Sequence, residues 1–268
     1  MAITTLDGAI SGAQPSVPYI KSGIAMAAVG ALRGYNPRYA SGNPGPATAP
    51  GAGINGAAVI GPGSQILRAN PGSGNAYLMG LDMAPSQQGM LWLIDRLWEN
   101  SGLSVTSITA QAMISPAALP ARDRTGTTNG VDVLAALEWL TTGGAGTPTV
   151  TLTYTDQTNA ANKTATFTGV TTPPVGTFEI FQPGAASGGV RAPTSFIQSA
   201  TRTSGTMSLV LFRKIAAVPC QLANVGAALN FLTGGAQRIF DNACLEPIWF
   251  PSATTAVNLL GGYTETQG

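Results

Sequence analysis

The stretch Pro148-Thr-Val-Thr-Leu-Thr-Tyr-Thr-Asp156, followed after a short linker by Lys163-Thr-Ala-Thr-Phe-Thr168, decides the fold class. Val150, Leu152 and Tyr154 alternate with threonines, and this period of two is typical of a half-buried β-strand. Thr, Val, Tyr and Phe all favour a pleated surface. Because the linker is polar and compatible with a turn, we predict a β-hairpin.

Similar segments recur along the chain, separated by Gly- and Pro-containing turns. Several short strands at roughly even spacing are typical of a sandwich or a jelly roll. The predicted fold class is therefore all-β, a jelly-roll-like β-sandwich with one or two short helices. The strands are predicted at residues 90–98, 131–140, 178–181, 195–199, 207–212 and 245–250. The first two also fit a short helix, and Pro247 favours an edge position for the last.

Helices are predicted outside these strands. Residues 18–33 and 222–232 carry apolar side chains at helical spacing, although Gly23 and Gly30 weaken the first helix. The tail at residues 261–268 is predicted to be exposed.

A Gly/Pro-rich segment at about residues 35–75 has too many helix and strand breakers for regular structure. It is either a disordered linker or an extended arm that lies along a neighbouring subunit. A solvated linker is usually charged or rich in serine, whereas this segment has no acidic residue and several apolar ones. We therefore predict an N-terminal arm over residues 1–85 and a β-sandwich body over residues 86–268, which includes a C-terminal helix and a late strand. The arm residues predicted to contact a capsid or a second subunit are Tyr35, Tyr39, Ile54, Val59, Ile60, Ile66 and Leu67.

Composition limits the classes of partner. The chain has 268 residues, a net charge of +1 and only 9% charged residues, against about 25% in a typical soluble domain. Binding of nucleic acid or acidic lipid needs clustered Lys and Arg, so we expect neither partner. The apolar run at residues 23–32 is too short to span a bilayer. Such a composition suits a protein held in a large assembly that covers its apolar surface.

No catalytic constellation is visible in the sequence. Histidine is absent, which removes Ser-His-Asp and Cys-His systems and the commonest metal ligand. The Gly51-Ala-Gly-Ile-Asn-Gly56 pattern does not follow a strand and has no acid at the ribose-binding offset. Cys220 and Cys244 are predicted to be small buried hydrophobes.

Carboxylates are the remaining candidates for chemistry. Nothing in the spacing of Asp95, Glu99, Asp123, Asp132 and Glu138 pairs them as a glycosidase requires. Asp123, Asn129 and Asp132 flank one loop that would suit calcium, but the EF-hand spacing is missing. We therefore predict a protein that is not an enzyme and has no cofactor, and whose melting temperature does not respond to a chelator.

Five segments carry a family likeness. They are residues 91–102 (LWLIDRLWENSG), 120–130 (PARDRTGTTNG), 144–154 (GAGTPTVTLTY), 238–242 (RIFDN) and 250–256 (FPSATTA) with the closing TQG. Together they resemble a group of virion structural proteins of tailed bacteriophages, from about residue 88 to the end. The resemblance implies a cement or decoration protein of the head and assigns no active site. A major capsid protein of the common phage fold would be expected to show a long spine helix, and none is visible.

Two functions from different classes remain open. In the first, the protein decorates and stabilises a phage capsid by bridging neighbouring subunits. Its partners are then the major capsid protein and copies of itself, expected as a homotrimer. It is made in the bacterial host cytoplasm and lies on the outer surface of the head. In the second, a tail- or head-associated adhesin module binds a host-surface glycan. The apolar, charge-poor arm favours the first, and removal of residues 1–75 is then expected to leave a folded body that no longer attaches to capsids.

Overall fold

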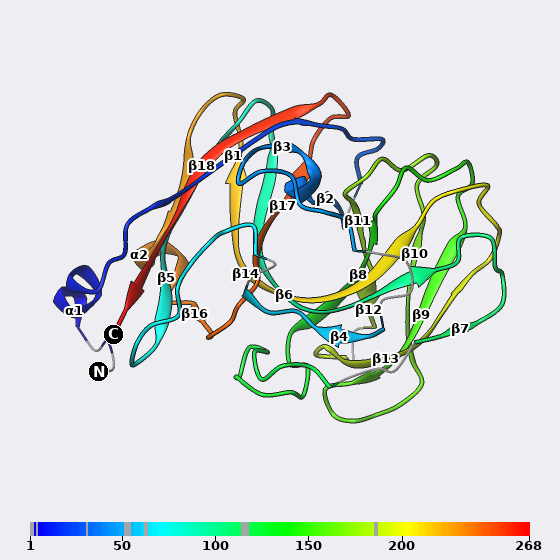
Figure 1. Cartoon of the computed structure of the whole chain (residues 1–268), viewed down its shortest axis with the longest axis horizontal. Coiled ribbons are helices and arrows are strands. Elements are labelled where there is room, and N and C mark those ends of the chain that lie inside the picture. The colour runs from blue at the N-terminus through cyan, green and yellow to red at the C-terminus, as the bar shows by residue number, and fades with distance from the viewer. Residues whose placement is uncertain are drawn as a thin grey trace.

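The computed structural model describes residues 3, 5–30, 32–50, 55–61, 64–113, 118–184 and 187–268. Over these residues the chain forms mainly antiparallel strands, in a central sheet with a smaller sheet on each side (Figure 1). The predicted all-β sandwich class is confirmed. None of the helices in the described ranges is long and apolar enough to cross a membrane.

The central sheet closes on itself. Its pairings run in the order β6, β14, β8, β11, β2 and β17, and β17 pairs back to β6. We call this closed sheet the ring, and the two-residue β4 (Ala57–Ala58) pairs beside the second half of β6. Side chains of a closed sheet alternate between its interior and its exterior. The ring strands are β2 (Arg33–Tyr35), β6 (Gly89–Leu103), β8 (Val133–Trp139), β11 (Thr177–Ile180), β14 (Met207–Cys220) and β17 (Leu245–Pro251).

A flanking sheet lies on each side of the ring in Figure 1. The six-stranded sheet has the order β15-β5-β18-β1-β3, with β16 beside β5. Its strands are β1 (Val17–Ile24), β3 (Ser41–Asn43), β5 (Ala76–Pro85), β15 (Ala227–Asn230), β16 (Arg238–Ile239) and β18 (Val257–Gln267). The five-stranded sheet has the order β12-β10-β9-β13-β7. Its strands are β7 (Gln111–Ala112), β9 (Thr149–Asp156), β10 (Lys163–Thr168), β12 (Gln182–Pro183) and β13 (Val190–Gln198).

Three hydrophobic cores follow from this arrangement. The core toward the six-stranded sheet includes Leu93 and Trp249 of the ring together with Tyr19 and Leu259. The core toward the five-stranded sheet includes Trp139, Leu152 and Tyr154. The third core fills the ring and includes Ile94, Phe178 and Phe212. Burial of side chains like these stabilises a fold by about 1.5–3 kcal/mol each.

The predicted hairpin is confirmed. β9 and β10 pair antiparallel with Tyr154 opposite Lys163, and Val150, Leu152 and Tyr154 are all buried. The other predicted strands also exist in the structure, extended at several ends. Pro247 is not on an edge strand, because β17 lies between β2 and β6. The pairing of β17 with β2 is confined to Trp249, so Pro247 has a strand partner on one side only, which a proline tolerates.

The predicted division into an arm at 1–85 and a body at 86–268 is wrong in its boundary. Of the segment predicted to be irregular, about residues 35–75, the described residues from 44 onward are irregular apart from β4, whereas residues 35–43 contain a short 3-10 helix and β3. However, β2 closes the ring, and β1 and β5 both pair with β18. The predicted helix at 18–33 is wrong, because residues 18–24 belong to the strand β1, in which Tyr19, Lys21 and Ile24 are buried between exposed neighbours, and Arg33 begins β2. Removal of residues 1–75 is therefore expected to unfold the protein.

Two predictions near the C-terminal end are also wrong. Residues 222–232 contain the strand β15, and the helix α2 (Phe231–Gly234) begins only after it. The tail at 261–268 is not exposed, because β18 runs between β1 and β5 and buries Tyr263. The glycines that suggest a loose tail allow this close packing, since a Cβ at Gly261 would collide with the carbonyl oxygen of Asp82.

Candidate functional site

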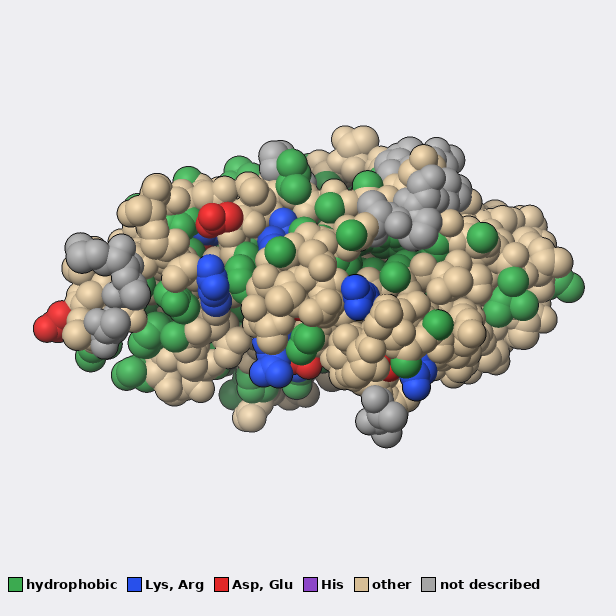
Figure 2. Space-filling model, turned by 90° about the horizontal axis from the view of Figure 1, so that it is seen from below, with side chains coloured by type: hydrophobic (Ala, Val, Ile, Leu, Met, Phe, Trp, Pro, Cys, Tyr) green, Lys and Arg blue, Asp and Glu red, His purple; other side chains and the backbone are tan. Residues whose placement is uncertain are grey.

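Most of the charge of this protein lies inside it. The chain has 13 basic and 12 acidic side chains, and thirteen of these are buried. The remaining surface is poor in charge: on the face shown in Figure 2, the blue and red atoms form small separate groups among tan and green. On this face, therefore, a charged patch that would attract a polyelectrolyte such as nucleic acid is not part of the candidate site.

An ion cluster closes one end of the ring interior. Nη2 of Arg96 on β6 lies 2.7 Å from Oε2 of Glu138 on β8 and 3.0 Å from Oε2 of Glu246 on β17. All three side chains are fully buried. The amide nitrogen of Asn36 donates to both carboxylates at 2.7 and 2.8 Å, and Nη1 of Arg38 lies 3.1 Å from Oε1 of Glu246. Arg38 belongs to the short 3-10 helix Pro37–Tyr39, which places its guanidinium at this end of the ring.

Arg96 and Glu246 of the ion cluster are held in their charged forms. Burial alone would raise the pKa of the Glu246 carboxyl, but Arg96 and Arg38 outweigh that effect and hold the pKa below its usual value. Arg96 is likewise kept protonated by Glu138 and Glu246, which raise its pKa against the effect of burial. The cluster therefore joins β6, β8 and β17 through paired side chains, and Nη1 of Arg96 also lies 2.9 Å from Glu99.

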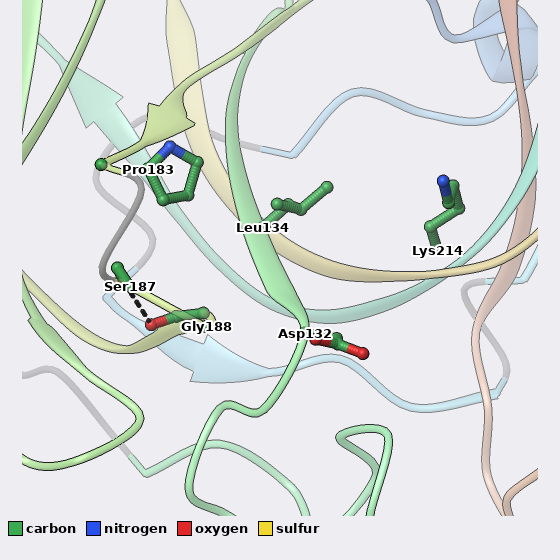
Figure 3. Close-up of a pocket in the computed structure, with 8 residues that line it drawn as sticks. Asp132, Leu134, Pro183, Ser187, Gly188 and Lys214 are labelled. Atoms are coloured by element: carbon green, nitrogen blue, oxygen red, sulfur yellow. Dashed lines mark hydrogen bonds between the residues drawn. The ribbon is translucent and has the colours of Figure 1, made fainter.

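The opposite end of the ring interior opens into a cavity of about 430 Å³ (Figure 3). Leu134 of β8 and Lys214 of β14 face this opening from one side, and Pro183 and Ser187 lie across it. The other lining residues are Asp132, Gly184, Gly188 and Gly189. Nζ of Lys214 lies 4.7 Å from the centre of the Trp92 ring, which packs 4.4 Å from the ring of Phe250. We call this cavity, together with the half-buried Trp92 and Phe250 beside it, the ring mouth.

The ring mouth carries one unbalanced positive charge. Asp132 is paired with Arg124, whose Nε lies 2.5 Å from its carboxylate. Lys214 is exposed, and no carboxylate among the described residues lies within ion-pair distance of it. A group that fills the mouth therefore gains most if it is apolar and carries a carboxylate or another anion.

The loop considered for calcium is held by its own hydrogen bonds. The Asp123 carboxylate accepts six bonds of 2.7–3.1 Å from Thr125, Thr127, Gly130 and Val131. Burial would raise the pKa of Asp123, but these bonds outweigh it and lower the pKa. Across the ranges that the structure describes, no group of three His, Cys, Asp or Glu side chains has the arrangement needed to hold a metal ion.

Cys220 and Cys244 are both free and buried, as predicted. Burial raises the pKa of the Cys220 thiol to about 11, and burial together with Glu246 raises that of Cys244. Since the thiolate is the nucleophile, we expect iodoacetamide to alkylate neither cysteine in the native protein at mildly alkaline pH. Mass spectrometry after alkylation should find both modified only when urea is present. Modification of either thiol without urea would contradict the burial.

The seven predicted contact residues are not brought together. Tyr35 and Ile66 are buried in the core between the ring and the six-stranded sheet, so their assignment as partner contacts is wrong. Tyr39 and Val59 are half-buried, and Ile60 and Leu67 are exposed. Ile54 lies outside the described residues.

An apolar face that the sequence did not indicate lies on the outer side of the six-stranded sheet. Leu260 of β18 stands opposite Ile20 of β1 on one side and Ala84 of β5 on the other. Ile20 and Leu260 are 42% and 56% exposed, and Leu260 and Ala84 border a groove of about 480 Å³. Asp82 is the one charged residue lining this groove among the described residues. We call the row Ala84, Leu260 and Ile20 the apolar face.

The outer face of the five-stranded sheet carries mainly hydroxyl groups, and its one exposed large aliphatic side chain among the described residues is Ile197, opposite Thr151 and 36% exposed. Thr151 and Thr153 of β9 stand opposite Thr166 and Thr164 of β10. All four lie on the side of the sheet away from the buried Leu152. We call this row of side chains the hydroxyl face, and each of its hydroxyls is able to exchange hydrogen bonds with water.

Comparisons of the chain with protein-family models, with curated proteins and with solved structures find no match.

Proposed function

We propose that this protein is a structural component of a tailed-phage virion that decorates the outer surface of the head and bridges neighbouring capsid subunits. The proposal rests on the contrast between the apolar face and the hydroxyl face, which lie on sheets flanking opposite sides of the ring (Figure 1). A protein with one apolar and one hydrated side has a defined orientation on a surface.

The apolar face is the side that attaches. Interface cores are depleted of charged residues and bury apolar side chains, and the face consists of Ala84, Leu260 and Ile20. Covering Ile20 and Leu260 completely would contribute about 1.5–3 kcal/mol each. Because this contribution does not depend on charge, attachment should persist at high salt.

The hydroxyl face then points away from the shell. Its threonines are hydrated without help from a partner, so this side needs no cover. The exposed Ile60 and Leu67 of the Gly/Pro-rich segment add contacts to neighbouring subunits, and copies of the chain associate around the attachment point as an expected trimer. In this proposal the protein acts by bridging subunits and has no catalytic step.

The test is attachment to heads. We expect the double variant Ile20→Glu/Leu260→Glu to bind empty heads of the host phage, prepared without this protein, more than about 100-fold more weakly than the wild type. Co-sedimentation with the heads measures binding. The matched control is Thr151→Glu/Thr166→Glu, which places the same charges on the hydroxyl face and should bind normally. Circular dichroism checks that both variants fold. Equal binding by the folded apolar-face variant and the wild type would exclude this face as the attachment surface.

One observation favours the alternative, an adhesin module that binds a host glycan. Trp92 and Phe250 form a half-buried aromatic pair at the ring mouth, and sugars stack on such rings. The Lys214 ammonium already lies over the Trp92 ring, which leaves less of the ring free for a sugar. Binding to a glycan array that is lost in Trp92→Ala would support the adhesin instead.

A further inference from the structure

We propose that the ring mouth is the docking pocket for helix α1 (Leu6–Ser11) of a second copy of this chain, which creates a head-to-tail contact between copies. The inference builds on the self-association included in the proposed function, and it names the two surfaces that meet.

The pocket is shallow and selective. The interior of the ring below it is already filled by Ile94, Phe212 and their neighbours, so it accepts a few side chains and not a threaded chain. Its walls offer apolar surface from Leu134 and Pro183. Its one unpaired cation, among the residues described, is Lys214. The volume of about 430 Å³ lies within the range of sites that bury small ligands.

Helix α1 presents the complementary groups. Leu6 and Ile10 are 54% and 56% exposed, and residues four apart lie on the same side of a helix. Asp7 lies beside them in the first turn, is exposed, and makes no ion pair with any described residue. The exposed side of helix α1 therefore combines two aliphatic side chains with one carboxylate, which matches an apolar pocket with one ammonium.

The helix is already fixed in place. Ala9 is buried, and its carbonyl oxygen accepts a 2.6 Å hydrogen bond from the Thr266 hydroxyl of β18. The Thr5 hydroxyl caps the first turn by accepting from the Gly8 amide at 3.0 Å. Docking a fixed helix costs less ordering entropy than docking a flexible segment.

Helix α1 does not fill the ring mouth of its own copy. Helix α1 lies at the outer end of the six-stranded sheet, whereas the mouth belongs to the central ring (Figure 1). The contact joins two different surfaces, so it is heterologous and either closes into a ring of copies or continues as a filament. Closure after three copies would give the expected trimer.

A charge exchange tests the contact. Sedimentation velocity of the full-length protein over a concentration series should show self-association. Asp7→Lys and Lys214→Glu each place like charges together, so each should weaken association about tenfold. The double variant Asp7→Lys/Lys214→Glu should restore it. Asp82→Lys alters charge away from both surfaces and serves as the control that should associate normally.

The outcomes separate the possible occupants. A wild type that stays monomeric throughout, or a double variant no better than the single variants, would overturn the inference. Head binding that is lost in Lys214→Glu, with self-association unchanged, would assign the mouth to the capsid protein instead. The apolar-face variant should still self-associate. If the double variant restores self-association, the contact between copies is supported. If the Ile20→Glu/Leu260→Glu variant also binds heads normally, the proposed attachment face is excluded while the contact between copies is kept.

Discussion

Replacing Arg96 with methionine is expected to lower the free energy of unfolding by about 3–5 kcal/mol. The substitution keeps the length of the side chain and removes the cation that contacts Glu138 and Glu246. Both carboxylates are fully buried, and a buried charge that loses its partner is strongly destabilising. Arg38 still reaches Glu246 at 3.1 Å but Glu138 only at 4.0 Å, so it compensates for only part of the loss.

Urea unfolding followed by tryptophan fluorescence measures this change. The control is Asp132→Asn, which breaks the exposed pair with Arg124 and should cost less than about 1 kcal/mol. The Glu246 pKa is lowered in the folded protein, so its contribution is complete above the unfolded value of about 4.3 and is lost as the pH falls through the folded value. The difference between wild type and Arg96→Met should therefore be largest near neutral pH. A loss below 1 kcal/mol at neutral pH would refute this role of the cluster.

Replacing Asp123 with alanine is expected to cost about 2–4 kcal/mol of stability, because several hydrogen-bond donors of one loop lose their acceptor together. The carboxylate accepts from the backbone amides of Thr125, Thr127, Gly130 and Val131. The next residue toward the N-terminus, Arg122, donates to the carbonyl oxygen of Arg96 at 2.9 Å. The loop is thus tied to the ring, so disorder of the loop in the alanine variant should also destabilise β6.

Thermal unfolding with and without a chelator separates this account from calcium binding. Asp123→Asn retains an oxygen acceptor and should lose less than the alanine variant, while a chelator should leave the melting temperature of the wild type unchanged. A clear fall with chelator would restore the calcium interpretation. An alanine variant as stable as wild type would mean that water replaces the carboxylate.

The sequence predicts those elements whose pattern is local. The alternation of Val150, Leu152 and Tyr154 is complete within one strand, so the β9–β10 hairpin follows from it. The closure of the ring does not, because β2 has only three residues and pairs with β17, which lies more than 200 residues further along the chain. In the sequence, Gly34 suggests an interruption of regular structure. In the structure, a Cβ at this position would stand 2.6 Å from Ile248, so glycine is what lets β2 fit.

The candidate site was hardly visible in the sequence. The low content of charged residues suggested an uncovered apolar surface, and we expected that surface in the Gly/Pro-rich segment. Ile20 and Leu260 are separated by 240 positions and meet only through the pairing of β1 with β18. Lys214 is one of three lysines, and nothing in its neighbourhood in the sequence indicates that it faces a ring.

The order of strands in the six-stranded sheet has a consequence for synthesis on the ribosome. β18, which ends at residue 267, lies between β1 and β5. A nascent chain that has already produced β1 and β5 therefore has two strands with unpaired edges until β18 emerges. Such edges are templates for pairing with other chains, and long-range pairing of this kind is slow. We expect newly made chains to depend on chaperones until translation passes β18, and ribosome-bound truncations that end before it to be sensitive to protease.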